Sequence, residues 1–392
     1  MDLFDKCHQF TIAKEAIEAG FYPYFIPLSE NEGTEAEFRG HRLIMCGSNN
    51  YLGLTTHPKV REAARQAINR FGTSCTGSRF LNGTLELHEQ LEHELADWVG
   101  KEAALVFSTG MQTNLGTISA LVGRGDVVVM DKDDHASIVD GAKLSWGETK
   151  RFRHNDMVDL ERVLSGIDES KGVLVVVDGL FSMGGDIAPL PELVKICKKY
   201  GAKLMVDDAH AMGVLGGGRG TAAHFGITDD VDLIMSTFSK SFASLGGFIA
   251  GDEPVIHYIK HHARSLIFSA SIPAANAAAS LAALQVMKEE PERIARLEQI
   301  GSQMRTEYKR LGFNTGQSQS PIIPIIIGGD MPTIYAWHSL FEKGVFVNPV
   351  ISPGVAAGQE LLRTSYMATH TDEQLNQVLE IFEQVGKQLG LI

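Results

Sequence analysis

The stretch AKLMVDDAHAMG (202–213) decides the fold, because a short apolar run ends abruptly in two aspartates and a histidine. A second run of this kind, DLIMSTFSK (232–240), ends in hydroxyl residues and a lysine. Continuously apolar runs are typical of parallel strands that are buried on both faces. The two runs therefore predict parallel strands of one sheet, and their polar ends are expected to face one crevice.

Outward from this pair, three more runs have the same character: AALVFSTG (103–110), DVVVMD (126–131) and VLVVVDG (173–179). Amphipathic stretches lie between the runs, among them LELHEQLEHELADWVG (85–100) and LPELVKICKKYG (190–201). Both stretches end in glycine, as helices commonly do. The alternation predicts an α/β fold, with a mostly parallel central sheet and helices on both of its faces.

The alternation of apolar runs and amphipathic stretches ends after residue 285. A charged helical stretch (289–312) is followed by two short runs, PIIPIII (321–327) and GVFVNPV (344–350), and by a last helix from about Thr371. We expect a small α+β C-terminal domain over 286–392 and a large domain over 49–285. Residues 1–48 are expected to form an N-terminal arm with a helix and a hairpin-like segment at 35–46.

Composition narrows the classes of function. The chain has 392 residues, 44% of them hydrophobic and 21% charged, which is typical of a soluble globular protein. Its formal net charge of −13 disfavours nucleic acid and anionic membranes as partners. Four scattered cysteines and a start without signal-peptide features indicate the cytoplasm. No His, Cys, Asp or Glu set has zinc-ligand spacing, so we expect no metal.

The strand ends carry the chemistry. A buried carboxylate such as Asp207 can keep a pyridinium nitrogen protonated, and Lys240 can form an imine. The hydroxyls of Thr237 and Ser239 suit a phosphate, and His135 follows another strand and could stack on a flat ring. Taken singly, a strand-end aspartate is more often a helix cap, and a lone lysine or loop histidine is more often solvated. The joint pattern favours a catalytic site.

Seven motifs resemble those of the α-oxoamine synthases, in family order across nearly the whole chain. They are GSNNYLGL (47–54), GSRFLNGT (77–84), FSTGMQTNLG (107–116), DHASIVDGA (134–142), DGLFSMGGDIAPL (178–190), VDDAHAMGVLG (206–216) and TFSKSFASLGGFIAG (237–251). The resemblance implies a fold type I enzyme that depends on pyridoxal 5'-phosphate (PLP). It also implies a homodimer whose subunits share their active sites.

Roles for individual residues follow from the same resemblance. Lys240 would be the Schiff-base lysine, Asp207 the partner of the ring nitrogen, and His135 the stacking residue. The phenolic oxygen of the cofactor would lie near His210 and Ser182. The phosphate would be held by four residues of this subunit and one of the second, namely Gly110, Met111, Thr237, Ser239 and Ser271. Met111 stands where the family often has an aromatic residue.

The substrate side is implied by LLRTSYMATHT (361–371), in which Arg363 would clamp the carboxylate of an amino acid. Asn50 and Ser78 complete the expected substrate-binding set.

The resemblance implies a decarboxylative condensation of an amino acid with an acyl thioester. TFSKS, RSLIFSAS (264–271) and LLRTSYMATHT most resemble the bacterial members that join serine to a palmitoyl thioester, giving 3-ketodihydrosphingosine. Glycine, alanine and cysteate stay open as amino acids, and coenzyme A and acyl carrier protein as acyl carriers. The rivals are an aminotransferase of the same fold and a noncatalytic subunit. At most peripheral contact with the inner membrane is expected, through Phe4, Cys7 and Phe10.

Overall fold

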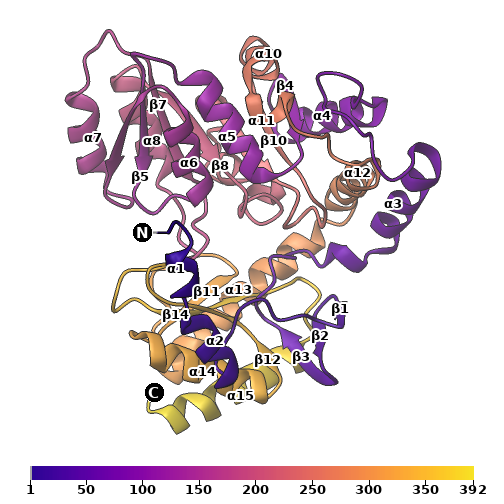
Figure 1. Cartoon of the computed structure of the whole chain (residues 1–392), viewed down its shortest axis with the longest axis vertical. Coiled ribbons are helices and arrows are strands. Elements are labelled where there is room, and N and C mark those ends of the chain that lie inside the picture. Colours follow the sequence, from indigo (N-terminus) through magenta and orange to yellow (C-terminus); the bar gives the residue numbers. More distant parts are fainter. Residues whose placement is uncertain (1) are drawn as a thin grey trace.

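A seven-stranded sheet forms the core of the larger part of the computed structural model, shown at the top of Figure 1; the structure describes residues 2–392. The strand order is β4-β10-β9-β8-β7-β5-β6, and only β10 in this sheet runs antiparallel to its neighbours. The strands are β4 (Ala103–Phe107), β5 (Val127–Asp131), β6 (Glu148–Phe152), β7 (Val173–Asp178), β8 (Lys203–Asp207), β9 (Leu233–Thr237) and β10 (Gly247–Gly251). All five runs that predicted strands form strands of this sheet.

Helices cover both faces of the sheet because alternate side chains of each strand enter two different cores. In β7, Val175 and Val177 pack with Leu160 of one face, whereas Val176 packs with Ile118 of the other. The first face carries α4 (Glu86–Val99), α7 (Met157–Ser165), α8 (Leu190–Lys199), α9 (Thr221–His224) and α12 (Ala274–Glu289). The second carries α5 (Gly110–Leu121), α6 (Ala136–Leu144), α10 (Glu253–His262) and α11 (Arg264–Ile267). The predicted fold class is confirmed.

The C-terminal part has a core of its own. Its antiparallel sheet has the order β11-β14-β13, with β11 (Ile322–Ile326), β14 (Leu361–Ser365) and β13 (Asn348–Val350). The helices α13 (Glu292–Leu311), α14 (Asp330–Glu342) and α15 (Asp372–Leu389) contribute Ile300, Trp337 and Phe382 to the core. This sheet matters for the site because its central strand, β14, carries Arg363.

The N-terminal hairpin packs with this C-terminal part. The strands β1 (Glu30–Glu32), β2 (Glu35–Phe38) and β3 (His41–Met45) form a sheet with β12 (Val345–Phe346), which pairs parallel to β3. Leu43 and Ile44 lie in the C-terminal core. After β3 the chain crosses to α3 (Pro58–Phe71), which packs on α12. The division of the chain at residues 48/49 and 285/286 stays a prediction, and α12 runs across the second of these points.

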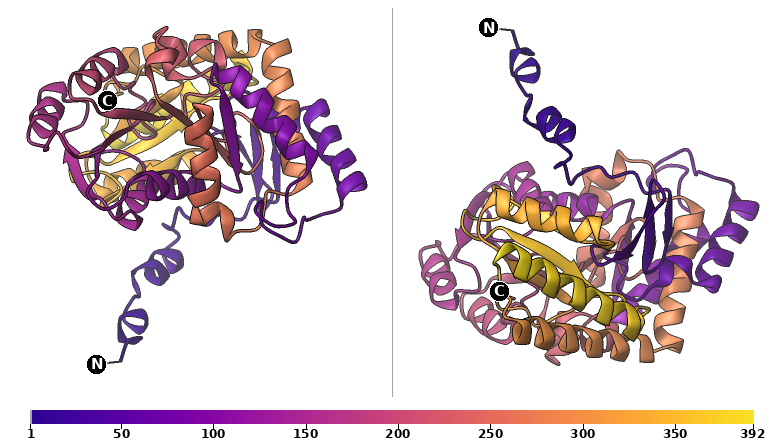
Figure 2. Two further views of the ribbon diagram at one scale, coloured as in Figure 1. Left: turned by 90° about the horizontal axis from the view of Figure 1, so that it is seen from above. Right: turned by 90° about the horizontal axis from the view of Figure 1, so that it is seen from below.

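The first two helices, α1 (Asp5–His8) and α2 (Ile12–Glu18), stand away from the body of the molecule (Figure 2). Neither helix contains a buried residue. Phe4, Cys7 and Phe10 are all exposed, although α1 is too short to include Phe10. Within residues 2–392, no helix combines the length and the apolar character that crossing a membrane requires.

Candidate active site

A cavity of about 210 Å³ opens at the carboxyl ends of the central strands. Asp207 is the last residue of β8, Thr237 is the last residue of β9, and Lys240 follows three residues later. The cavity is lined by the predicted ring-binding residues Asp207, His210, Lys240 and His135. The fold therefore brings together four of the side chains that the sequence predicted at the ends of strands.

Lys240 is the nucleophile that this cavity offers. Burial of its amine lowers the pKa of Lys240 to about 8, although the negative charges of Asp207 and Asp178 act in the opposite direction. A lysine with a lowered pKa is neutral in a useful fraction near physiological pH and can attack an aldehyde carbon. The arrangement therefore suits imine formation.

Asp207 is fixed by two hydrogen bonds. It is 4% exposed, and its carboxylate accepts from the Asn114 amide at 2.7 Å and from the backbone N–H of Ala209 at 3.0 Å. Asn114 also donates to Ser137 Oγ at 2.8 Å, and this hydroxyl lies 2.7 Å from His135 Nδ1. A chain of polar contacts thus connects Asp207 to His135, and it sets the position of the imidazole at the mouth of the cavity.

A second carboxyl group, that of Asp178, lies beside Asp207 on the neighbouring strand and also lines the cavity. Asp178 ends β7 and is 5% exposed, and its Oδ1 has no hydrogen-bond partner among the described residues. Burial, followed by the charge of Asp207, raises the pKa of Asp178 well above its usual range.

The other end of the cavity suits a phosphate. Gly110 and Met111 begin α5, whose first backbone N–H groups have no helical partners. Thr237 Oγ1 and Ser239 Oγ lie 2.9 Å apart beside them. A Cβ on Gly110 would come within 2.8 Å of Thr237 Oγ1, so only glycine permits this close approach of helix and strand. Amine, carboxylate and anion cradle together fit the aldehyde, ring nitrogen and phosphate of PLP.

Arg363 lies on the C-terminal side of the site and is 4% exposed. Its guanidinium donates to the Ser182 carbonyl at 2.6 Å, to Asn49 Oδ1 at 2.9 Å and to Tyr51 Oη at 3.3 Å. Ser365 Oγ is a fourth acceptor at 3.4 Å; all four partners are neutral, and in the described part of the chain no carboxylate forms an ion pair with this group. A buried cation without a counterion is suited to binding an anionic ligand.

Tyr51 connects this guanidinium to the cavity. Its hydroxyl lies 2.7 Å from His210 Nδ1, and His210 lines the cavity. Burial, then the charges of Lys240 and Arg363, lower the pKa of His210 well below its usual range. The imidazole is therefore neutral and can act as a hydrogen-bonding group on the side of the cavity nearest Arg363.

Five predicted residues lie outside the cavity lining, namely Asn50, Ser78, Ser182, Ser271 and Arg363. The amide of Asn50 donates to Thr55 Oγ1 at 2.8 Å, and it is the neighbouring Asn49 that contacts Arg363. Ser271 bonds to the Gly77 carbonyl, and Ser78 Oγ is buried without a described partner. Ser182 contributes its backbone carbonyl. The sequence reasoning missed Asn49, Tyr51, Asn114, Ser137 and Asp178, although each of them lies within a motif that it quoted.

Comparison with known proteins agrees with this geometry. The family model described as aminotransferase class I and II matches residues 42–382. A serine palmitoyltransferase of Sphingobacterium spiritivorum is 50% identical over 387 residues, which cover 98% of this chain and 97% of that protein. An 8-amino-7-oxononanoate synthase of Thermoanaerobacter pseudethanolicus is 40% identical, with 98% of this chain and 99% of that protein covered.

Solved structures extend the likeness to the whole fold. A variant serine palmitoyltransferase from S. paucimobilis with a bound PLP–myriocin aldimine superposes with a TM-score of 0.97, at 36% identity and with all of both chains covered. The chain belongs to the aminotransferase class I and II family, and the resemblance to the α-oxoamine synthases is confirmed.

Proposed function

We propose that this chain is a PLP-dependent serine palmitoyltransferase. It condenses L-serine with palmitoyl-coenzyme A and gives 3-ketodihydrosphingosine, coenzyme A and CO2. The observation that carries the proposal is a cavity lined by a lysine of lowered pKa and a fixed carboxylate, whose lining residue His210 is connected through Tyr51 to a guanidinium without a counterion. Near-full-length relatives that bear this name support the choice.

The residues at the cofactor end of the site have separate roles in the proposed reaction. Bound PLP supplies an electron sink for negative charge that develops at Cα of the amino acid. Lys240 holds the cofactor, and its amine, once free, takes the Cα proton: the C–H bond breaks and an N–H bond forms. Asp207 keeps a proton on the ring nitrogen through a charged hydrogen bond. The first turn of α5, with Thr237 and Ser239, binds the phosphate.

The carboxylate of serine is assigned to Arg363, because a planar guanidinium can bind it through two parallel hydrogen bonds. Binding there orients Cα toward Lys240 and His135. The new C–C bond forms at Cα when the thiol leaves the acyl group, the carboxylate departs as CO2, and a proton returns to Cα. His210 and Tyr51 complete the polar wall between the carboxylate and the ring.

A homodimer completes the proposal. Large apolar side chains stand exposed beside Ser78 and Ser271, namely Phe80, Leu81 and Phe268, with exposed fractions of 56%, 77% and 74%. A second subunit that covers them would bring Ser271 and Ser78 to the neighbouring site, as the family pattern implies. Sedimentation at micromolar concentration should give twice the mass of the chain, and a monomer that is fully active would contradict this assembly.

Thiol release tests the reaction directly. The PLP-loaded protein should release coenzyme A from palmitoyl-coenzyme A with serine, and much more slowly with glycine, alanine or cysteate. A preference for another amino acid would support the same reaction with a different substrate. The 40% identity to an 8-amino-7-oxononanoate synthase is the reason for testing other amino acids. Palmitoyl-acyl carrier protein serves as the alternative donor in the same assay. Amino-group transfer without thiol release would overturn the proposal.

A further inference from the structure

A tight turn between β7 and α8 supports the arginine that we assign to the substrate carboxylate. The turn is closed by hydrogen bonds from Phe181 N to the Asp186 carbonyl at 3.0 Å and from Gly185 N to the Phe181 carbonyl at 2.9 Å. Ser182, inside this turn, offers its carbonyl to Arg363. The turn therefore supplies one of the contacts that position the guanidinium.

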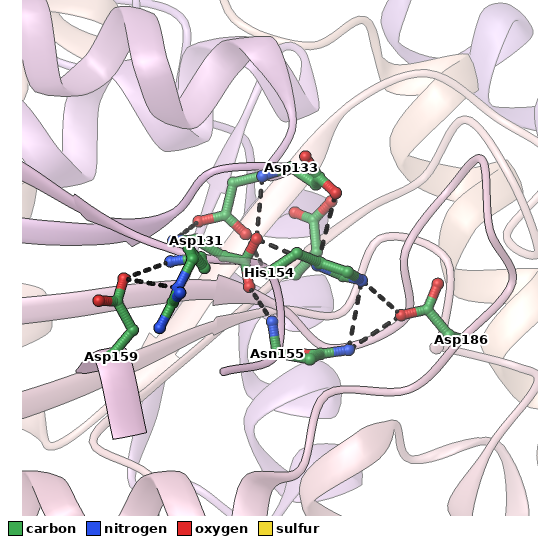
Figure 3. A network of polar contacts seen from close by, with 9 residues as sticks. Asp131, Asp133, His154, Asn155, Asp159 and Asp186 are labelled. Carbon is green, nitrogen blue, oxygen red and sulfur yellow. Dashed lines mark hydrogen bonds and ion pairs between the residues drawn. The ribbon is translucent and has the colours of Figure 1, made fainter. Parts of the chain in front are cut away.

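The turn is held from its other side by His154, which follows β6 (Figure 3). His154 Nε2 lies 2.9 Å from Asp186 Oδ2, and Nδ1 lies 3.1 Å from Asp131 Oδ1. The imidazole also meets the Phe181 ring edge-on, with 4.4 Å between the ring centres. One side chain thus contacts both ends of the turn and ties them to the end of β5.

The next residue strengthens the same connection. Asn155 adopts a φ of +50°, which asparagine tolerates better than most residues. This conformation lets its backbone N–H donate to Asp131 Oδ2 at 2.8 Å while its amide donates to Asp186 Oδ2 at 2.9 Å. Two adjacent residues therefore join the same two carboxylates, as the dashed lines in Figure 3 show.

His154 is a cation in this network. Burial alone would lower its pKa, but hydrogen bonds to Asp131 and Asp186 outweigh burial and raise the pKa to about 10. Asp133 adds a third carboxylate, 3.8 Å from Nδ1. In the imidazolium form both ring nitrogens can donate to carboxylates.

We propose that His154 is a positioning residue for binding of the amino acid carboxylate. It acts through Asp186 and the Phe181–Asp186 turn, whose Ser182 carbonyl orients Arg363. Without the imidazolium, the carboxylates of Asp131 and Asp186 lose their shared charged partner, and of the two adjacent residues only Asn155 still joins them. The inference rests on the proposed role of Arg363, and it concerns the amino acid and not the acyl thioester.

Four variants of the PLP-loaded protein test this: His154→Ala, His154→Gln, Asp186→Asn and Arg153→Ala. The last is the matched control, because Arg153 is also paired with carboxylates, Asp156 and Asp159, but does not contact the turn. Serine affinity is read from the visible spectrum, and the KM of palmitoyl-coenzyme A from thiol release. We expect His154→Ala and Asp186→Asn to weaken serine binding about tenfold, which corresponds to the loss of one charged hydrogen bond.

His154→Gln keeps one hydrogen-bond donor and should restore part of the serine affinity. The KM of the acyl thioester should stay within about twofold in all four variants, and Arg153→Ala should bind serine normally. Equal weakening of both substrates, or unchanged serine affinity in both His154→Ala and Asp186→Asn, would overturn the proposal. If His154→Ala does not fold, His154→Gln and Asp186→Asn decide the question.

Hydrogen exchange gives a readout that does not depend on activity. In the protein without cofactor, the amides of Phe181 and Gly185 should exchange faster in His154→Ala than in the wild type and in Arg153→Ala. Unchanged exchange would contradict the role of the turn. Failure of the proposed function would look different, because the wild-type protein would then show no serine-dependent spectral change or thiol release.

Discussion

The two ends of the site are built differently. At the cofactor end, Asp207 ends one strand and Lys240 follows the neighbouring strand of the same sheet, so a single sheet brings them together. At the carboxylate end, Arg363 lies on a different sheet, and its partners Asn49, Tyr51 and Ser182 come from two distant segments. The first end depends on one sheet, and the second depends on the packing of three parts of the chain.

The charges differ in the same way. Lys240 has two carboxyl groups nearby and a pKa lowered to about 8, so it can exchange its proton during the reaction. Arg363 has only neutral hydrogen-bond partners within residues 2–392. A group that transfers protons and a group that binds a fixed anion thus have opposite surroundings within one site.

The largest effect is expected at the cofactor end. Lys240→Ala should lower turnover by at least about 10²–10⁴-fold, because it removes the amine that holds the cofactor and takes the Cα proton. The visible absorbance of the lysine-bound cofactor should disappear, while circular dichroism should show an intact fold. Lys260→Ala, an exposed lysine on α10, is the matched control. Substantial turnover by Lys240→Ala would remove the basis of the comparison.

At the carboxylate end the expected effect is smaller and selective. Arg363→Ala should raise the KM of serine about 10–150-fold, which corresponds to the roughly 1.5–3 kcal/mol of a hydrogen bond to a charged group. The KM of palmitoyl-coenzyme A should change little, because the acyl group does not contact the guanidinium in our assignment. Steady-state kinetics with each substrate varied in turn separates the two constants. Equal changes in both would show that the two ends are not separate.

The pH dependence of PLP capture tests whether the surroundings of Lys240 lower its pKa. Because burial lowers the pKa of Lys240 to about 8, the neutral amine should increase about tenfold per pH unit below 8 and level off above it. The rate at which cofactor-free protein captures PLP should follow this curve when measured by stopped-flow absorbance. A rate that still rises steeply from pH 9 to 10 would indicate an ordinary lysine. The Arg363→Lys variant provides the control, since its Lys240 and phosphate cradle are unchanged.

The smallest effect concerns the phosphate. Ser239→Ala should weaken PLP binding by about three- to tenfold, since one exposed hydroxyl contributes on the order of 1 kcal/mol while the α5 backbone and Thr237 remain. Equilibrium dialysis of the cofactor measures this. Ser244→Ala, whose hydroxyl donates to the Asn276 carbonyl away from the cavity lining, is the matched control. An equal loss in both variants would argue against a phosphate contact at Ser239.

Most of the fold could be predicted from the sequence because buried parallel strands leave continuous apolar runs. Two strands of the central sheet were missed. β6 reads ETKRF and is largely exposed at the edge of the sheet, so its residues are under little pressure to be apolar. β10 reads GFIAG, and its glycines resemble a loop after Lys240, yet Gly247 is required by close contact with Gly110. Both misses reflect tertiary position and not local propensity.

Tertiary position also explains which residues of the site could be predicted from the sequence and which could not. Asp207, Thr237 and Lys240 were found because strand ends can be located in a sequence. Asn49, Tyr51 and Asn114 were missed, because their importance lies in contacts with residues 93–314 positions away. The pairing of β3 with β12 likewise joins residues that are far apart in the sequence. It connects the hairpin of the expected N-terminal arm to the C-terminal core.

The identity of the cofactor-bearing lysine is the central claim, and chemical trapping tests it most directly. The PLP-loaded protein is reduced with borohydride and digested, and the modified peptide is located by mass spectrometry. The account predicts one phosphopyridoxyl group per chain on Lys240, in the peptide that contains TFSKSFASLGG. Modification of a different lysine, or none at all in a protein that turns over, would contradict it.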